Sequence, residues 1–123
     1  RSTCEPVTES VPPSLQIERV KQALSARLDA EMSMRQIASR FEVNPYTLLR
    51  QFKAAAGITP YAYRLNCRIE RAKTLLREGL QLSQVALECG FYDQSHFHRH
   101  FKALTAVTPG EYQVNFVQSF PLD

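Results

Sequence analysis

The chain has 123 residues, of which 44% are hydrophobic and 22% charged, ordinary values for a folded domain. It has no apolar run near the ~18 residues of a membrane-spanning helix and no basic-then-apolar leader, so neither a transmembrane protein nor a secreted precursor is predicted. The three cysteines are far apart and form no disulfide framework or zinc-binding pair, which favours a reducing cytoplasm.

The net charge of +3 is unevenly distributed along the chain. Residues 34–78 carry nine Lys and Arg against three Asp and Glu, whereas residues 79–123 carry two against four. Such a basic cluster is common on a solvated helix face. It also suits a polyanionic partner, so charge alone leaves both interpretations open.

The N-terminal residues 1–13 contain Ser, Thr, Glu and three prolines, and we expect them to form a flexible linker. The chain begins at Arg1 rather than at Met, which suggests a piece of a longer protein. From Ser14 an apolar stripe at helical spacing predicts a helix that ends near Asp29.

Six further helices are predicted, each after a residue whose side chain can cap a helix N-terminus. The predicted N-caps are Ser33, Asn44, Thr59, Ser83, Asp93 and Thr108. The corresponding helices span about 34–41, 45–56, 60–78, 84–89, 94–105 and 109–117. Since no segment alternates with a period of two, the sequence predicts an all-α fold.

One short passage occurs twice in the chain. The Ile-Ala pair of the first copy recurs as Val-Ala 48 residues later, whereas the remaining matched residues recur 49 residues later. The second copy therefore has one extra residue between this pair and the remaining matched residues. Each copy predicts two short helices joined by a turn of three or four residues, which is typical of a helix-turn-helix. A plain helical hairpin is commoner, but the second copy argues against it. We therefore expect helix-turn-helix subdomains at 14–59 and 79–123, joined by a linker helix at 60–78.

The second helix of each predicted unit has one apolar and one polar face. We expect Leu48, Phe52 and Ala55 to be buried in the first unit, and Phe97, Phe101 and Leu104 in the second. The opposite faces carry donors, acceptors and cations of the kind that contact base edges and phosphates in DNA. The candidate DNA-binding residues are Tyr46, Thr47, Leu49, Arg50, Lys53, Gln94, Ser95, His98, Arg99 and Lys102.

Tyr46 and Leu49 could equally be core residues, since each is also apolar. In the alternative, Leu49 would contact a thymine methyl group.

Three histidines, His96, His98 and His100, lie on the predicted helix 94–105. His96 and His100 have the i, i+4 spacing of some metal sites, but no further ligand stands at a suitable spacing. We expect all three to be exposed positions that face an anion. No catalytic constellation or cofactor motif is present, so we predict neither an enzyme nor a cofactor.

The predicted linker helix has an apolar stripe formed by Leu65, Ile69, Ala72 and Leu76. Five cations surround the stripe: Arg64, Arg68, Arg71, Lys73 and Arg77. A straight helix of this length would span about 27 Å. We therefore expect the second helices of the two units, which would be the recognition helices, to lie ~34 Å apart, a distance of one turn of B-DNA.

The tract from Val85 to Lys102, followed by Thr108-Pro109-Gly110-Glu111-Tyr112, resembles the signature of the AraC/XylS family of bacterial transcription regulators. The resemblance covers about residues 14–117. It implies seven helices, two helix-turn-helix units and a long linker helix. It also implies that the second helix of each unit enters the major groove of double-stranded promoter DNA. The family usually has Gly where Ala106 stands and a basic residue where Gln113 stands.

The resemblance further implies RNA polymerase as a partner and an N-terminal effector-binding or dimerisation domain beyond this chain. Two other interpretations stay open. One is the DNA-binding module of a repair sensor with a reactive cysteine, for which only Cys4 lies in the right direction. The other is a helical protein-interaction module without DNA contact. The sequence indicates neither the operator nor the effector.

Overall fold

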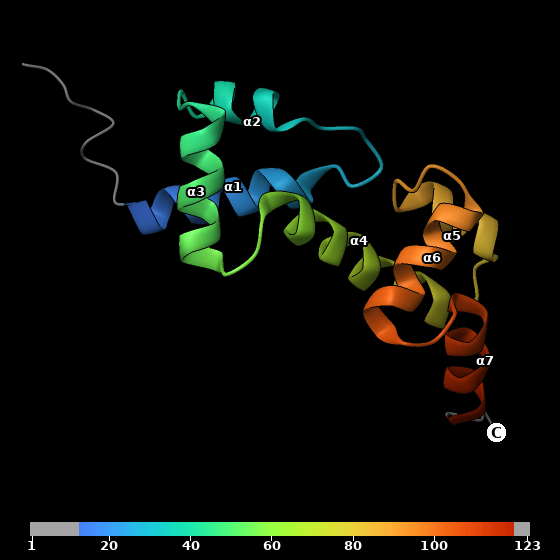
Figure 1. The fold of residues 1–123 in the computed structure, drawn as a ribbon. Coiled ribbons are helices and arrows are strands. Elements are labelled where there is room, and N and C mark those ends of the chain that lie inside the picture. The colour runs from blue at the N-terminus through green and yellow to red at the C-terminus, as the bar shows by residue number, and fades with distance from the viewer. Residues whose placement is uncertain (1–12, 120–123) are drawn as a thin grey trace, which may run out of the picture. The chain divides into compact units, whose positions relative to one another are not determined.

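The computed structural model describes residues 13–119, which form seven α-helices and no strand (Figure 1). The all-α prediction is confirmed. Most of the predicted tail, including Cys4, lies outside the described residues. None of the helices within 13–119 is long and apolar enough to cross a membrane. The helices are α1 (Pro13–Ala26), α2 (Met34–Arg40), α3 (Pro45–Ala56), α4 (Pro60–Arg77), α5 (Leu82–Glu88), α6 (Gln94–Thr105) and α7 (Pro109–Ser119).

The chain divides into two compact units. The first unit holds α1, α2, α3 and the start of α4 as far as Tyr63. The second unit holds α4 from Arg64 onward, α5, α6 and α7, together with the short segment Arg27–Glu31. Each unit has its own hydrophobic core.

Side-chain caps fix the starts of most helices. Asn44 Oδ1 accepts from the Tyr46 backbone N–H at 2.8 Å, and Asp93 Oδ1 accepts from that of His96 at 2.7 Å. These bonds satisfy backbone donors that a helix leaves unpaired at its start. Ser33, Thr59 and Thr108 cap α2, α4 and α7 in the same way.

Ser83 is the exception among the predicted caps. Helix α5 begins at Leu82, its N-cap is Gln81, and no side chain caps it. Leu80 and Leu82 both pack against the second core. Their burial sets the start of the helix, so Ser83 falls inside the first turn.

The internal repeat is longer than the sequence analysis predicted. Residues 17–24, in α1, read IERVKQAL, and residues 69–76, in α4, read IERAKTLL. Both helices bury the same positions, Ile17, Val20 and Leu24 in one and Ile69, Ala72 and Leu76 in the other. Both also carry a Glu–Lys ion pair three residues apart. Helix α4 is therefore the first helix of the second unit, equivalent to α1 in the first.

The buried faces of the two equivalent helices α3 and α6 match closely. Phe52 meets the edge of Tyr63 with ring centroids 5.7 Å apart, and Phe101 meets Tyr112 at 5.6 Å. The predicted burial of Ala55 and Leu104 is wrong, because both are exposed. Four residues span slightly more than one helical turn. The row of buried residues, which are spaced four apart, therefore rotates gradually around each helix and leaves Ala55 and Leu104 on the exposed side.

The turn within each helix-turn-helix has a residue in the left-handed region, Glu42 with φ 57° and Gly90 with φ 85°. The following residues, Val43 and Phe91, each donate a backbone hydrogen bond of 3.0 Å to the first helix of the pair. The next residue is the cap in the first unit but Tyr92 in the second. Tyr92 is thus the added residue of the second copy, and it is 89% exposed.

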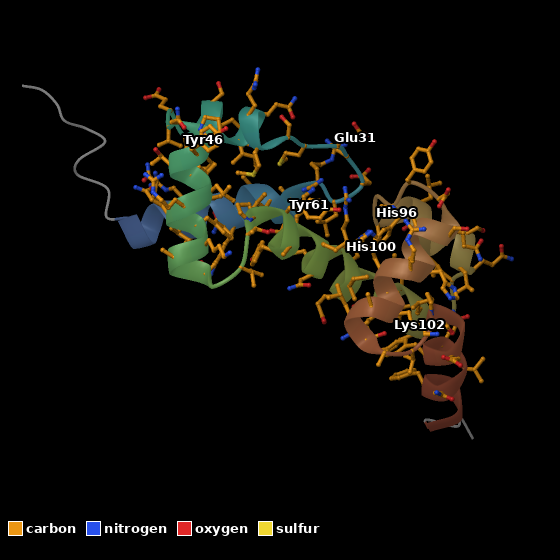
Figure 2. The ribbon with its side chains drawn as sticks, viewed as in Figure 1. Glu31, Tyr46, Tyr61, His96, His100 and Lys102 are labelled. Carbon is orange, nitrogen blue, oxygen red and sulfur yellow. The ribbon has the colours of Figure 1, made fainter. Side chains whose placement is uncertain are left out.

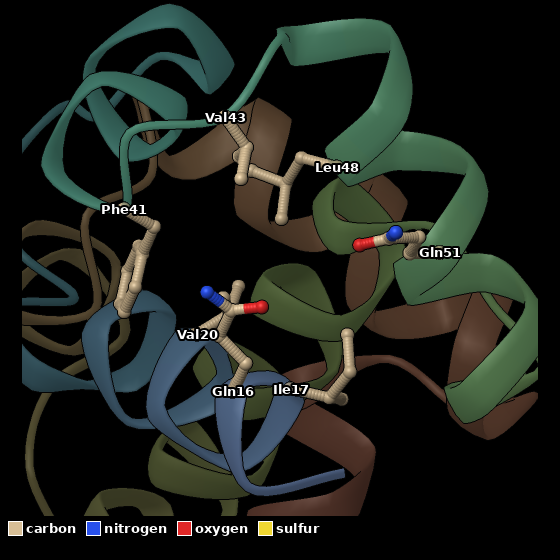
Figure 3. A pocket seen from close by; sticks show the side chains of 7 residues that line it. All are labelled: Gln16, Ile17, Val20, Phe41, Val43, Leu48 and Gln51. Carbon is tan, nitrogen blue, oxygen red and sulfur yellow. The ribbon is translucent and has the colours of Figure 1, made fainter. Parts of the chain in front are cut away.

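The first unit has a small hollow beside its turn (Figure 3). Its volume is about 220 Å³, including space open to solvent. In the second unit Phe91 and Phe97 stand where the first has Val43 and Leu48, and both rings are buried. Larger side chains thus occupy those two positions in the second copy. The hollow is lined by Gln16, Ile17, Val20, Phe41, Val43, Leu48 and Gln51.

Candidate nucleic-acid interface

Helix α3 presents its predicted face to solvent (Figure 2). Tyr46 is 78% exposed and Leu49 is 39% exposed, so the structure excludes the core alternative for Tyr46 and disfavours it for Leu49. Arg50 and Lys53 are also exposed, while Thr47 is half-buried. The buried side chains Leu48 and Phe52 point the other way, into the first core.

Helix α6 presents an equivalent face in the second unit. Its predicted residues Gln94, Ser95, His98, Arg99 and Lys102 are all exposed. None of the ion pairs found in residues 13–119 uses the cations of these two faces. Their charges are therefore available to an anionic partner.

An acidic side chain lies near the α6 face. The pKa of Glu111 is lowered, first by hydrogen bonds from Thr108 and then by the nearby charges of Lys102 and His98. Glu111 thus stays ionised beside two candidate DNA-binding residues. This makes the polar face of the second unit less positive than the α6 cations alone suggest.

The prediction that all three histidines are exposed is wrong for His96 and His100, which are half-buried. The backbone N–H of Tyr92 donates to His96 Nδ1 at 3.1 Å, and the His96 and His100 rings meet edge to face at 4.5 Å. Both rings also contact Phe91. Burial lowers the pKa of His100, and the neighbouring His96 and Arg99 lower it further. These two histidines support the turn, and His98 alone of the three is exposed.

Two of the five cations that surround the apolar stripe of α4 bind backbone carbonyls instead of forming a solvated basic face. Arg64 is buried, with 6% of its surface exposed, and its guanidinium donates to the backbone carbonyls of Arg27 and Ala30. Arg68 donates to those of Leu28 and Ala30, at 3.0 and 3.3 Å. The sequence could not reveal these contacts because the acceptors are backbone atoms 34 to 40 residues away.

Two further exposed cations lie on the helix that precedes α3, outside the set of predicted DNA-binding residues. Arg35 and Arg40 lie on α2, the helix that precedes α3 in the helix-turn-helix, and both are exposed. In this motif the first helix crosses the DNA backbone, which suits long cationic side chains. The basic excess of residues 34–78 was the signal that could have identified them.

The comparisons with known proteins agree with this geometry. A family model described as a helix-turn-helix domain matches residues 37–115, which is more than half of the chain. The chain is 46% identical over 63 residues to the probable transcriptional regulator LumQ of Photobacterium leiognathi, covering 50% of this chain and 25% of that protein. It spans about a quarter to a third of the length of the curated relatives that it matches.

Solved structures show the same fold. An AraC-type transcriptional regulator from Chromobacterium violaceum matches with a TM-score of 0.79 and 27% identity, covering 85% of this chain and 95% of that one. The DNA-binding domain of AdpA, solved in complex with a target DNA, matches with a TM-score of 0.81 and 21% identity, covering 87% and 97%. The chain belongs to the AraC-type helix-turn-helix family of transcription regulators. This family consists of DNA-binding regulators and not of enzymes.

Proposed function

We propose that this chain is the DNA-binding part of a bacterial transcription regulator, and that α3 and α6 read successive major-groove segments of one operator. The main support is that two units of the same construction each bury one face of an equivalent helix and expose a polar, cationic face opposite. The AdpA structure shows a domain of this fold bound to DNA. The functional parts would be the subdomains 14–59 and 79–123 and the connecting helix 60–78.

Each exposed residue type suits a particular contact. Arg50 and Arg99 can donate two hydrogen bonds to guanine, and Gln94 can pair with adenine. Lys53 and Lys102 suit phosphate oxygens, and Leu49 suits a thymine methyl group. The other proposed contacts to bases or phosphates come from Tyr46, Thr47, Ser95 and His98.

Membership in a regulator family supports three further parts of the proposal. RNA polymerase would be a second partner at the promoter. An effector-binding or dimerisation domain would lie in the longer protein, in keeping with the greater length of the relatives. The compartment would be the bacterial cytoplasm, where promoter DNA is found.

Selection of bound sequences from a random pool of duplex DNA tests the proposal. We expect two conserved motifs whose centres lie about ten base pairs apart. Affinity for the selected duplex should fall steeply as salt rises, because bound Lys and Arg release counterions from phosphates. Weak binding without an enriched motif would contradict sequence-specific recognition. Binding to no duplex at low salt would leave the protein-interaction module as the better account.

A further inference from the structure

The segment Arg27–Glu31 connects α1 to α2 in the chain, but it belongs to a different unit from these two helices. Both of these helices belong to the first unit, whereas the segment belongs to the second. The chain therefore passes between the units three times, after Ala26, after Glu31 and after Tyr63. The segment follows directly on the end of α1 and leads to α2.

Two arginines of α4 hold the segment through its backbone. Arg64 Nη2 donates to the carbonyl of Arg27 at 2.8 Å and also to that of Ala30. Arg68 Nε donates to the carbonyl of Leu28 at 3.0 Å, and its Nη2 reaches Ala30 at 3.3 Å. Hydrogen bonds from a charged donor are stronger than those between neutral groups, and the planar guanidinium can serve several acceptors at once.

The turn of the second helix-turn-helix closes on the same segment. A Cβ atom at Gly90 would lie 1.9 Å from the Leu28 carbonyl oxygen and 2.9 Å from Arg68 Nη2, so only glycine fits this approach. The guanidinium carbon of Arg68 lies over the Phe91 ring, 6.0 Å from its centroid. The ring centroids of Phe91 and of Phe97 on α6 are 5.0 Å apart. The segment is thus in contact with the turn that supports the second recognition helix.

The first unit lacks the corresponding residues. Where the second unit has Arg68, the equivalent position of α1 is Gln16, and where the second has Gly90, the first has Glu42. These contacts are therefore a feature of the second copy and not a requirement of the helix-turn-helix itself. A feature found in the second copy only, acting on a segment between two helices of the first copy, points to a role in connecting the copies.

We propose that Arg64, Arg68 and Gly90 form a clasp on Arg27–Glu31 that positions the two units for simultaneous binding to one operator. This inference rests on the proposed function. When one unit is bound, the effective concentration of the other at its site depends on the stiffness of the connection. The clasp restricts the conformations of the short segment between α1 and α2, so it should raise that effective concentration at one spacing of the two motifs and lower it at others.

The test compares clasp variants on duplexes of different design. The duplexes are the selected operator, the same operator with one to five base pairs inserted between its motifs, and a duplex with the first motif alone. Arg68→Gln is the main variant. Arg68→Lys keeps the charge and most of the packing but cannot serve two separated carbonyls, so it covers the case in which Arg68→Gln folds poorly. Arg71→Gln is the matched control, since Arg71 is exposed on the same helix and its substitution removes the same charge.

We expect both Arg68 variants to bind the selected operator about tenfold more weakly than the unaltered protein and to bind the single motif within about twofold of it. Their preference for the original spacing should also shrink. The Arg71→Gln control should lose a similar, small factor on every duplex. Without DNA, hydrogen exchange should become faster at the Ala30 amide, which donates to Arg27 O at 3.1 Å in the clasped segment.

The outcomes separate the two ideas. If the unaltered protein binds no duplex with specificity, the proposed function fails and the positioning role fails with it. If the unaltered protein binds the two-motif operator but the Arg68 variants keep its spacing preference, the clasp is wrong and the proposed function stands. Equal losses on the single motif and the full operator would also overturn the clasp, because they would indicate a general loss of structure or a direct phosphate contact.

Discussion

At the scale of single residues, Ala106 stands in a backbone conformation that favours glycine. It ends α6 with φ 71°, and its N–H donates to the carbonyl of Lys102 at 2.8 Å. In the first unit Gly57 ends α3 in the same way, with φ 83°. A side chain in the left-handed region costs about 1 kcal/mol, so the end of α6 carries a strain that the end of α3 does not.

We expect Ala106→Gly to raise the free energy of unfolding by about 0.5–1 kcal/mol, since it relieves this strain. Urea denaturation of both proteins measures the change. Ala103→Gly, at an exposed position inside the same helix, is the control and should lower stability by about 0.5–1 kcal/mol. A loss of stability at both positions would show that the strain at Ala106 is negligible.

His100 gives the second unit a dependence on pH. Its pKa in the folded protein is lowered, chiefly by burial, so the unfolded chain binds a proton more readily. Stability from the neutral ring is therefore fully present above the unfolded pKa of about 6.5 and is lost as pH falls below it. We expect His100→Gln, which introduces the residue found at the equivalent position 51, to weaken the fall in stability between pH 7.5 and 5.5. Urea denaturation at several pH values checks this. An unchanged slope in the variant would rule out His100 as the cause, and His98→Gln is the exposed control on the same helix.

At the scale of secondary-structure elements, the helices differ in how firmly they begin. Helices α3 and α6, which carry the proposed DNA contacts, both have side-chain caps. Helix α5, which begins at Leu82, has none, although the backbone of its N-cap residue Gln81 has the extended conformation of an N-cap. Its start depends on the packing of Leu80 and Leu82 instead.

A cap added to α5 should therefore stabilise the second unit. We expect Gln81→Ser to raise the free energy of unfolding by about 0.5–1 kcal/mol, because its hydroxyl can accept from a free N–H of the first turn. Ser83→Ala should change it by less than about 0.5 kcal/mol, because Ser83 lies within the helix and is exposed. Thermal or urea unfolding measures both. A large loss for Ser83→Ala would restore Ser83 as the cap.

At the scale of the whole molecule, the two units differ in charge. The described residues of the first unit carry six Lys and Arg against two Asp and Glu, and those of the second carry eight against seven. Two of the eight, Arg64 and Arg68, are bound to backbone carbonyls. The first unit should therefore supply most of the attraction to phosphates, while the second mainly adds discrimination.

This difference predicts unequal effects of equivalent substitutions. Arg50→Ala should weaken binding to random-sequence DNA more than Arg99→Ala, although the two arginines occupy equivalent positions. If Arg50 contacts a phosphate, its loss should also reduce the salt dependence of binding by about one counterion. Salt titrations of both variants provide the measurement. A larger loss for Arg99→Ala would contradict the assignment of affinity to the first unit.

Much of the fold and the exposed faces could be predicted because they depend on local patterns. A cap such as Asn44 acts on the residue two positions later, and the stripe of Leu48 and Phe52 repeats within one helix. These features need no knowledge of distant parts of the chain. The duplicated passage likewise indicated two units, and the matching residues 17–24 and 69–76 extend it into α1 and α4, where the same positions are buried.

The tertiary structure alone decided the roles of Arg64, Arg68, His96 and His100. By sequence each of them is a polar residue on a helix, equally suited to solvent, phosphate or protein. A helical pattern shows which residues share a face, but it does not show what lies against that face. The carbonyls of Arg27–Glu31 and the ring of Phe91 come from other parts of the chain. Folding brings these groups together, and their burial and hydrogen bonding direct the side chains inward.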